Sequence, residues 1–218
     1  MSILLKIRRK LGSIYFYSAL TSLIGAVLSF IYVKYAGYEE FGLFVLLMSM
    51  IGVMLDIVSS RTSEGVTYFS KLDHDRKNVI FSGCVFDIAI AAVFTLVIFL
   101  FYFYYNKFEA LVSIDNQAVL LYALYPFTRI LFGTTQGLLI ADEKYSVVII
   151  VNFISSFTRL FSTFFIVYYT ELNHTNIALT YAISTFVFFP LLIKTLYLSS
   201  FWDLANRVVV PGFFSYSV

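Results

Sequence analysis

The sequence has few of the residues that build disulfide frameworks, metal sites or histidine-dependent catalysis. Among its 218 residues are one cysteine, three prolines, two histidines and one tryptophan. The cysteine, Cys84, lies inside an apolar run, which excludes an intrachain disulfide and a thiolate metal cluster. We interpret Cys84 as a small packing residue.

Charged residues are also scarce. They make up 13% of the chain, and the formal net charge of +2 is too small to indicate nucleic acid binding. Hydrophobic residues make up 60% and aromatic residues 20%, and the mean hydropathy is +0.86. An ordinary soluble domain does not reach such values. The composition therefore predicts an integral membrane protein.

Long apolar runs define the expected fold. A helix needs about 20 mostly apolar residues to cross the hydrocarbon core of a bilayer. Six stretches meet this requirement, namely residues 14–33, 41–58, 79–104, 118–140, 147–169 and 177–198. The first is too long for the apolar region of a signal peptide. We therefore expect an all-α integral membrane protein with six transmembrane helices, in which residues 59–78 extend the second helix and then turn.

Basic residues are distributed unevenly over the connections. With the N-terminus in the cytoplasm, nearly all lysines and arginines outside the spans fall on the inner side, and the outer segments hold only Lys34 and Lys107. Positive charge is enriched in cytoplasmic loops. This pattern predicts a multi-pass protein with the N-terminus and the C-terminus both cytoplasmic.

Four charged residues fall inside the predicted spans. Arg129 and Arg159 lie near the middle of the membrane, and Asp56 and Asp87 lie in the inner halves of their helices. Each costs about 2.5–3.5 kcal/mol at a helix centre, so we expect all four to face the protein interior. Two roles are open for the arginines, binding of a ligand or structural ion pairing with the aspartates. Asp56 and Asp87 are candidates for ion coupling or for restraining the arginines.

Three spans have a polar face at helical spacing. The fifth aligns Asn152, Ser155, Ser156, Arg159, Ser162 and Thr163; the fourth aligns Tyr122, Tyr125, Pro126, Arg129, Gly133, Gln136 and Gly137; the first aligns Ser18, Thr21, Ser22, Gly25, Ser29 and Tyr32. Three such faces predict one shared cavity. For the small residues, simple helix packing is the alternative.

Proline and glycine mark a candidate hinge in the fourth span. Pro126 cannot donate a hydrogen bond to the carbonyl of Tyr122, which predicts a kink beside Arg129. Gly133 and Gly137 are the other hinge candidates, and Pro190 is a second kink candidate in the sixth span. A bend without a functional role is the alternative for both prolines.

The sequence offers little that is typical of enzymes. It has no glycine-rich phosphate loop and no Cys-x-x-Cys pair. His74 and His174 fall on opposite sides of the membrane in the expected topology, which argues against a histidine metal pair. We interpret the loop of Asp73, His74 and Asp75 as solvated. We therefore expect no enzymatic activity, no metal and no cofactor.

Two stretches resemble the Wzx-type oligosaccharide flippases, which belong to the multidrug, oligosaccharidyl-lipid and polysaccharide exporter superfamily. The first contains a short outer turn and the beginning of the second span, with Gly37, Glu39, Glu40, Phe41, Gly42, Leu43 and Phe44 at the matching positions. The second is "LFGTTQGLLIADEKYSVVIIVNFISSFTRL", with a charged inner turn followed by an Asn and an Arg in the next helix. The resemblance covers most of residues 1–200.

The resemblance implies a fold with two six-helix lobes, in a chain about twice this long. Residues 1–200 would form the first lobe, and residues 201–218 would be a short tail, left by a truncation or a frameshift. A second half-lobe or a homodimer would complete the two-lobe arrangement. The lipid bilayer, a lipid-linked oligosaccharide and the polysaccharide polymerase machinery are the implied partners.

The resemblance further implies a transporter of the bacterial inner membrane. Such a flippase moves undecaprenyl-pyrophosphate-linked oligosaccharide across this membrane for synthesis of capsular polysaccharide or of the O-antigen of lipopolysaccharide. On this hypothesis Arg129 and Arg159 bind the pyrophosphate, because a guanidinium group holds phosphate oxygens in a planar fork. The remaining expected substrate contacts are Asn152, Gln136, Tyr122 and Tyr125. A drug antiporter of the same superfamily, a membrane-bound glycan transferase and an inactive truncated remnant are the alternatives.

Overall fold

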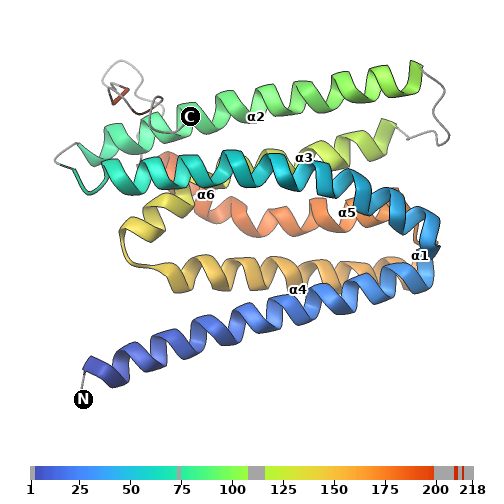
Figure 1. The fold of residues 1–218 in the computed structure, drawn as a ribbon, viewed down its shortest axis with the longest axis horizontal. Coiled ribbons are helices and arrows are strands. Elements are labelled where there is room, and N and C mark those ends of the chain that lie inside the picture. Colours follow the sequence, from blue (N-terminus) through green and yellow to red (C-terminus); the bar gives the residue numbers. More distant parts are fainter. Residues whose placement is uncertain (1–2, 73–74, 108–115, 199–208, 211–212, 214–218) are drawn as a thin grey trace.

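The computed structural model describes residues 3–72, 75–107, 116–198, 209, 210 and 213 (Figure 1). Its elements are α1 (Ile3–Phe69), α2 (Arg76–Lys107), α3 (Asn116–Ala141), α4 (Tyr145–Tyr169), α5 (His174–Thr185), the 3₁₀ helix η1 (Phe186–Phe188) and α6 (Phe189–Leu198). No strand occurs in the described residues. The expected all-α class is confirmed for this part of the chain.

Helix α1 consists of two limbs that reverse direction at Gly37. This residue has φ 86° and ψ 171°, a combination that is open to glycine and strained for other residues. Figure 1 shows limb 1 (residues 3–36, blue) running to the reversal and limb 2 (residues 38–69, cyan) running back. Among the described residues, five helices are long and apolar enough to cross a membrane, and the first of them, Ile14–Val53, includes parts of both limbs. The six expected spans thus correspond to the two limbs and four further helical segments.

The bundle has two distinct ends. The Gly37 end holds the reversal of α1 and the loop 170–173, whereas the Asp142 end holds the start of α1, the loop 142–144 and the end of α6 (Figure 1). At the Gly37 end, the backbone N–H of His174 donates to Glu40 Oε2 at 2.8 Å, and His174 Nδ1 lies 2.6 Å from the same oxygen. At the Asp142 end, Asp142 accepts from Arg76 at 2.7 Å and from Lys144 at 3.2 Å. At each end, therefore, a side-chain contact joins segments that are distant in the sequence.

The expected helix at 177–198 is interrupted. It consists of α5, one turn of 3₁₀ helix and α6, and Pro190 is the second residue of α6. Proline has no N–H to donate to the carbonyl four residues earlier, which is that of Phe186. The N–H of Phe189 bonds to this carbonyl instead, in the tighter 3₁₀ pattern. The 3₁₀ turn therefore lies where Pro190 was expected to disturb the helix, and the kink itself stays a prediction.

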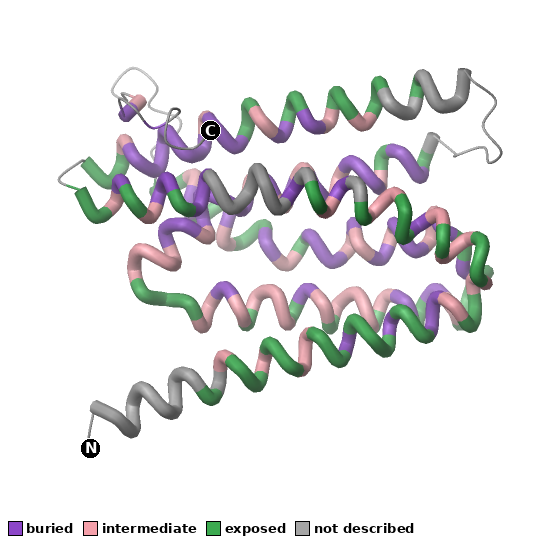
Figure 2. The backbone as a smooth tube through the Cα atoms, viewed as in Figure 1, coloured by how far each residue is buried: buried purple, intermediate pink, exposed green. Residues whose placement is uncertain are grey.

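The surface is apolar and part of the interior is polar. Large apolar side chains are exposed along the helices, among them Leu23, Phe30, Leu46, Leu96, Phe157, Phe161, Phe165 and Ile193. The buried polar residues are mostly Ser and Thr, among them Thr128, Thr163, Thr185 and Thr195, which bond to carbonyls of their own helix. Figure 2 shows exposed positions recurring along limb 1 and α4. Such an apolar outer surface suits a lipid environment.

Helix α3 is the central element and packs against α1, α2 and α5. It approaches limb 2 closely at two glycines. A Cβ atom at Gly137 would lie 2.7 Å from the backbone oxygen of Ser63, and one at Gly133 would lie 3.3 Å from Cβ of Thr62. These glycines permit close helix packing, which is the alternative to a hinge that the sequence left open.

Candidate functional site

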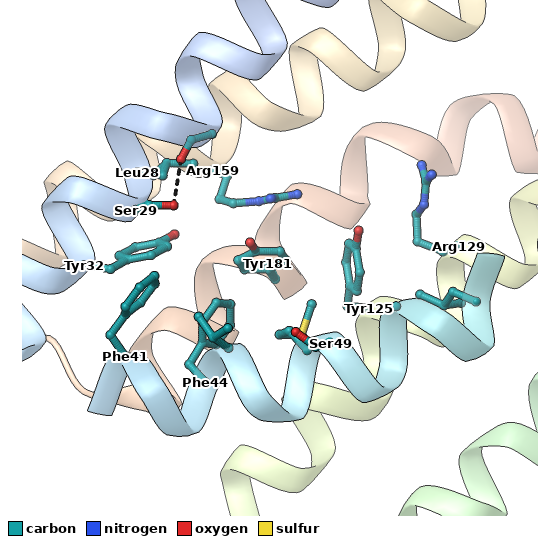
Figure 3. A pocket seen from close by; sticks show the side chains of 15 residues that line it. Leu28, Ser29, Tyr32, Phe41, Phe44, Ser49, Tyr125, Arg129, Arg159 and Tyr181 are labelled. Carbon is teal, nitrogen blue, oxygen red and sulfur yellow. Dashed lines mark hydrogen bonds between the residues drawn. The ribbon is translucent and has the colours of Figure 1, made fainter. Parts of the chain in front are cut away.

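One cavity brings the two predicted arginines together. Its volume is about 410 Å³, and it lies between both limbs of α1, α3, α4 and α5 (Figure 3). It is lined by Gly25, Leu28, Ser29, Tyr32, Phe41, Phe44, Val45, Met48, Ser49, Gly52, Leu55, Tyr125, Arg129, Arg159 and Tyr181. Residues from all three predicted polar faces are among them. Its charged residues are Arg129 and Arg159.

Arg159 of α4 is held by aromatic rings. Its guanidinium carbon lies 3.6 Å from the centre of the Tyr181 ring and 5.9 Å from that of Tyr125. A cation above an aromatic face is stabilised by about 2 kcal/mol when water is excluded. The buried Nε of Arg159 has no hydrogen-bond partner among the described atoms. The rings therefore stabilise the charge, and the Nε donor of the guanidinium group is left without a described partner.

Arg129 of α3 is held differently. Its Nη1 donates to Oδ1 of Asn152 at 3.0 Å, and its guanidinium carbon lies 5.2 Å from the centre of the Phe188 ring. Asn152 therefore belongs to the site as a partner of Arg129 and is not part of the cavity lining. In Figure 3 the ring of Tyr125 lies between the two guanidinium groups. Each arginine thus has its own support, although both line the same cavity.

The Gly37 end of the cavity is aromatic. The hydroxyl of Tyr32 is hydrogen-bonded to Thr163 at 3.2 Å and to Thr180 at 3.1 Å, which joins limb 1 to α4 and α5. The ring of Phe44 packs against the rings of Tyr32 and Tyr181, with centroid distances of 5.9 Å and 5.2 Å. These contacts fix the orientation of Tyr181 under Arg159.

Asp87 lies outside this cavity. Its side chain is 1% exposed, and Oδ2 accepts the backbone N–H of Thr134 at 2.8 Å. Neither Arg129 nor Arg159 forms an ion pair with a carboxylate of the described side chains. Asp56 belongs to α1, but its side chain lies outside the described part of the structure. For Asp87, therefore, the structural pairing with an arginine that the sequence left open is not found.

The remaining predicted residues are distributed as follows. Tyr125 lines the cavity, and Tyr122 and Gln136 do not. Tyr122 is buried, and its hydroxyl donates to the carbonyl of His174 at 3.4 Å. Pro126 lies inside α3, and the kink expected beside Arg129 stays a prediction. His74 and Asp73 lie outside the described residues, as does most of the tail 201–218.

Sequence reasoning missed several aromatic residues of the site. Tyr181, Phe41 and Phe44 stand in stretches without a polar stripe, and aromatic residues are so frequent in this chain that no single one is conspicuous. The predicted position of Arg159 inside the membrane could have indicated an aromatic partner, because a cation there needs either a carboxylate or an aromatic face. The sequence could not show which of 42 Tyr and Phe residues, 17 Tyr and 25 Phe, supplies it.

Comparisons with protein families, with curated proteins and with solved structures give no match. The fold and the site themselves define the class, an all-helical protein with helices long and apolar enough to span a membrane. Within this class, the chain encloses a cavity that carries two arginines.

Proposed function

We propose that this chain is one lobe of a membrane flippase for an anionic, lipid-linked saccharide, with Arg159 and Arg129 as the groups that bind the anion. The observation that carries the proposal is the cavity with two guanidinium groups, neither paired with a described carboxylate. Two positive charges beside one cavity favour a negatively charged cargo. A drug antiporter for cations would need the opposite charge.

The donor geometry favours a phosphate or pyrophosphate group. A guanidinium group has five N–H donors in a planar fork that matches phosphate oxygens. One donor of Arg129 is used by Asn152, and Nε of Arg159 has no partner among the described atoms. Charge-assisted hydrogen bonds to a pyrophosphate would satisfy the remaining donors.

The rest of the lining favours a saccharide next to the anion. It combines the rings of Tyr32, Tyr125 and Tyr181 with the small side chains of Ser29 and Ser49. Hydroxyl groups offer both donors and acceptors to sugar hydroxyls. The volume of about 410 Å³ lies within the usual range for ligand pockets, about 300–1,000 Å³.

The proposed setting is the bacterial cytoplasmic membrane, with the Asp142 end on the cytoplasmic side. Lys71, Arg76, Lys77 and Lys144 all belong to this end, and the positive-inside rule supports this orientation. The cargo would be an undecaprenyl-pyrophosphate-linked oligosaccharide for O-antigen or capsule synthesis. A second lobe or a second copy of the chain would cover the cavity from the other side.

The proposal is tested with the purified full-length chain. Binding of a fluorescent undecaprenyl-pyrophosphate saccharide is measured in nanodiscs, and its movement between leaflets is measured in proteoliposomes. We expect Arg159→Ala to weaken binding about tenfold or more, the effect of losing a charge-assisted hydrogen bond. Arg76→Ala is the matched control, because Arg76 is exposed and pairs with Asp142 far from the cavity.

Two results would contradict the proposal. One is wild-type protein that neither binds nor moves the lipid; the other is an Arg159→Ala variant that binds as tightly as the Arg76→Ala control. Arg159→Lys retains the charge without the planar fork, and we expect intermediate binding from it. A neutral lipid-linked saccharide without phosphate serves as the control ligand and should not bind.

A further inference from the structure

A second polar cluster lies apart from the cavity, at the contact of limb 2, α2 and α3. It consists of Asp87, Thr62 and Thr134, whose side chains are 1%, 0% and 0% exposed. Asp87 Oδ1 and the hydroxyls of Thr62 and Thr134 have no hydrogen-bond partner among the described atoms. Both threonine hydroxyls lie beside the carboxyl group of Asp87. Three unpartnered oxygens in one buried place are unusual, because such groups are nearly always paired.

An ionised carboxylate is poorly supported here. It accepts the backbone N–H of Thr134 at 2.8 Å, and the neighbouring hydroxyls of Thr62 and Thr134 are neutral groups that bring no charge to balance it. A buried charge costs several kcal/mol unless it is paired and well hydrogen-bonded. The energetically simpler state is a neutral carboxylic acid, which has an O–H to donate from Oδ1 to a threonine hydroxyl.

The packing around the cluster is close. A Cβ atom at Gly133 would lie 3.1 Å from Asp87 Oδ1 and 3.3 Å from Cβ of Thr62. A Cβ atom at Gly83 would lie 2.5 Å from Oγ1 of Thr134. On another side, Asp87 borders a cavity of about 210 Å³ whose lining is mostly apolar. The threonine hydroxyls of that lining, those of Thr135 and Thr195, bond to each other, so the cavity offers few oxygen ligands to a metal ion. A proton needs no coordination sphere and fits the same place.

The neighbouring helices supply no described charge to Asp87. On α2, the thiol of Cys84 is buried nearby, and on α3, Arg129 is turned to Asn152 and Phe188. Glu64 of limb 2 and Lys194 of α6 are both exposed. The side chains of residues 56–61 lie outside the described part. Within the described side chains, therefore, no cation balances Asp87.

We propose that Asp87 is a proton-binding site, with Thr62 and Thr134 as the hydroxyls that receive the acid O–H. Release of this proton to water leaves a negative charge where limb 2, α2 and α3 meet. That charge favours separation of limb 2 and α3 and entry of water. Both helices also line the cavity, and Arg129 lies one turn from Gly133 on the same face of α3. Proton release at Asp87 thereby changes the cavity, and this inference is independent of which cargo the cavity holds.

Infrared spectroscopy tests the protonation state directly. Full-length protein in nanodiscs is measured at neutral pH, with and without ¹³C-labelled aspartate. We expect a carbonyl stretch of a protonated carboxylic acid in the wild-type protein, which shifts with the label and is absent from Asp87→Asn. A wild-type spectrum without this band, or a band that persists in Asp87→Asn, would overturn the proposal. Absence of the band from wild type overturns the proposal even if Asp87→Asn fails to fold, and Asp87→Glu, whose band does not shift with labelled aspartate, then replaces it as the variant.

A stability titration provides the second test. Asparagine retains an oxygen acceptor for Thr134 and cannot ionise. We expect equal apparent Tm values for wild type and Asp87→Asn near pH 4, and then a wild-type loss of about 3–5 °C per pH unit relative to the variant. The sign follows because the folded protein binds a proton that the unfolded chain releases above about pH 4. Asp142→Asn is the matched control, and its difference from wild type should have the opposite sign.

A sodium ion is the alternative to a proton at Asp87, and melting curves in two salts distinguish them. The same melting curves are recorded in NaCl and in choline chloride at equal concentration. We expect no difference between the two salts. A rise in Tm with sodium that is lost in Asp87→Asn would replace the proton with a metal ion and overturn the assignment. An Asp87→Asn variant that melts far below wild type at every pH would show that the folded state needs the charge.

Discussion

At the scale of single residues, the main finding concerns how a charge is kept inside an apolar bundle. Arg159 lies over the ring of Tyr181 at 3.6 Å, and Arg129 donates to Asn152 at 3.0 Å. Neither arrangement cancels the positive charge. An ion pair would have removed the field that the proposed anionic cargo needs, whereas a ring or an amide leaves most of it in place.

The contact between Arg159 and Tyr181 can be measured by a double-mutant cycle. We expect Arg159→Ala and Tyr181→Leu together to destabilise the protein by about 1 kcal/mol less than the sum of the single variants, because both remove the same cation–π interaction. Unfolding free energies of the four proteins in mixed micelles give the coupling. Tyr181→Phe is the control and should retain most of it. Strictly additive effects would show that the ring contributes only packing.

A surface carboxylate gives a prediction with a defined pH dependence. Burial alone would raise the pKa of Asp142, but hydrogen bonds and charge from Arg76 and Lys144 outweigh it and hold the pKa below its usual value. A carboxyl group with a lowered pKa stabilises the folded state above about pH 4, and this contribution is lost as the pH falls through the folded-state pKa. Because the pair is partly exposed, the effect should be below about 1 kcal/mol.

The measurement compares wild type with Asp142→Asn from about pH 6 down to about pH 3. We expect wild type to have the higher Tm at pH 6 and the difference to disappear in acid. High salt should reduce the difference at pH 6, because partly exposed charges are screened. A difference that grows as the pH falls would have the wrong sign for this explanation.

At the scale of helices, glycines determine where elements turn and where they touch. Gly37 supplies a backbone conformation that reverses α1, and Gly137 lets α3 approach the backbone of limb 2. The two roles are physically different. At Gly37 a Cβ atom has open space but the wrong φ and ψ, whereas at Gly137 it meets the oxygen of Ser63 at 2.7 Å.

Alanine substitutions separate these roles. We expect Gly37→Ala to cost about 1–3 kcal/mol from backbone strain, and Gly137→Ala to cost about 1–3 kcal/mol from overpacking. Gly42→Ala is the matched control, because Gly42 is helical with no atom near its would-be Cβ, and we expect it to be neutral or stabilising by up to about 1 kcal/mol.

The free energies of unfolding of these variants show whether backbone strain or overpacking is responsible. Removing the Cβ atom of the partner should rescue the packing variant but not the strained one. Val66→Gly is therefore combined with each and also made alone, since Cβ of Gly137→Ala would lie 2.8 Å from Cβ of Val66. We expect partial recovery at most, because the oxygen of Ser63 remains. A Gly37→Ala variant as stable as Gly42→Ala would contradict the strained reversal.

At the scale of the whole molecule, the alternation of the helices separates the loops into two groups. Tyr38 lies beside the reversal and is 82% exposed, whereas Lys144 lies in the loop at the opposite end. If the Asp142 end is cytoplasmic, the two positions face different compartments. This orientation rests on the distribution of lysine and arginine alone.

Cysteine labelling in intact cells tests the orientation. In a Cys84→Ser background, we expect Tyr38→Cys to react with a membrane-impermeant maleimide and Lys144→Cys to react only after the cells are opened. Wild-type Cys84 is buried and should remain unlabelled, which makes it the internal control. The reverse pattern would invert the proposed topology and place the Asp142 end outside.

The sequence by itself determined the class of fold, because a helix that crosses a membrane must satisfy its backbone internally and expose about 20 apolar residues. It also showed that Arg129, Arg159 and Asp87 face the interior, since the cost of lipid exposure leaves no other place for them. Only the tertiary structure decided their partners. Tyr181 and Asn152 support the arginines, and Thr62 and Thr134 surround Asp87, because side-chain contacts between distant helices depend on packing angles and rotations that no local pattern encodes.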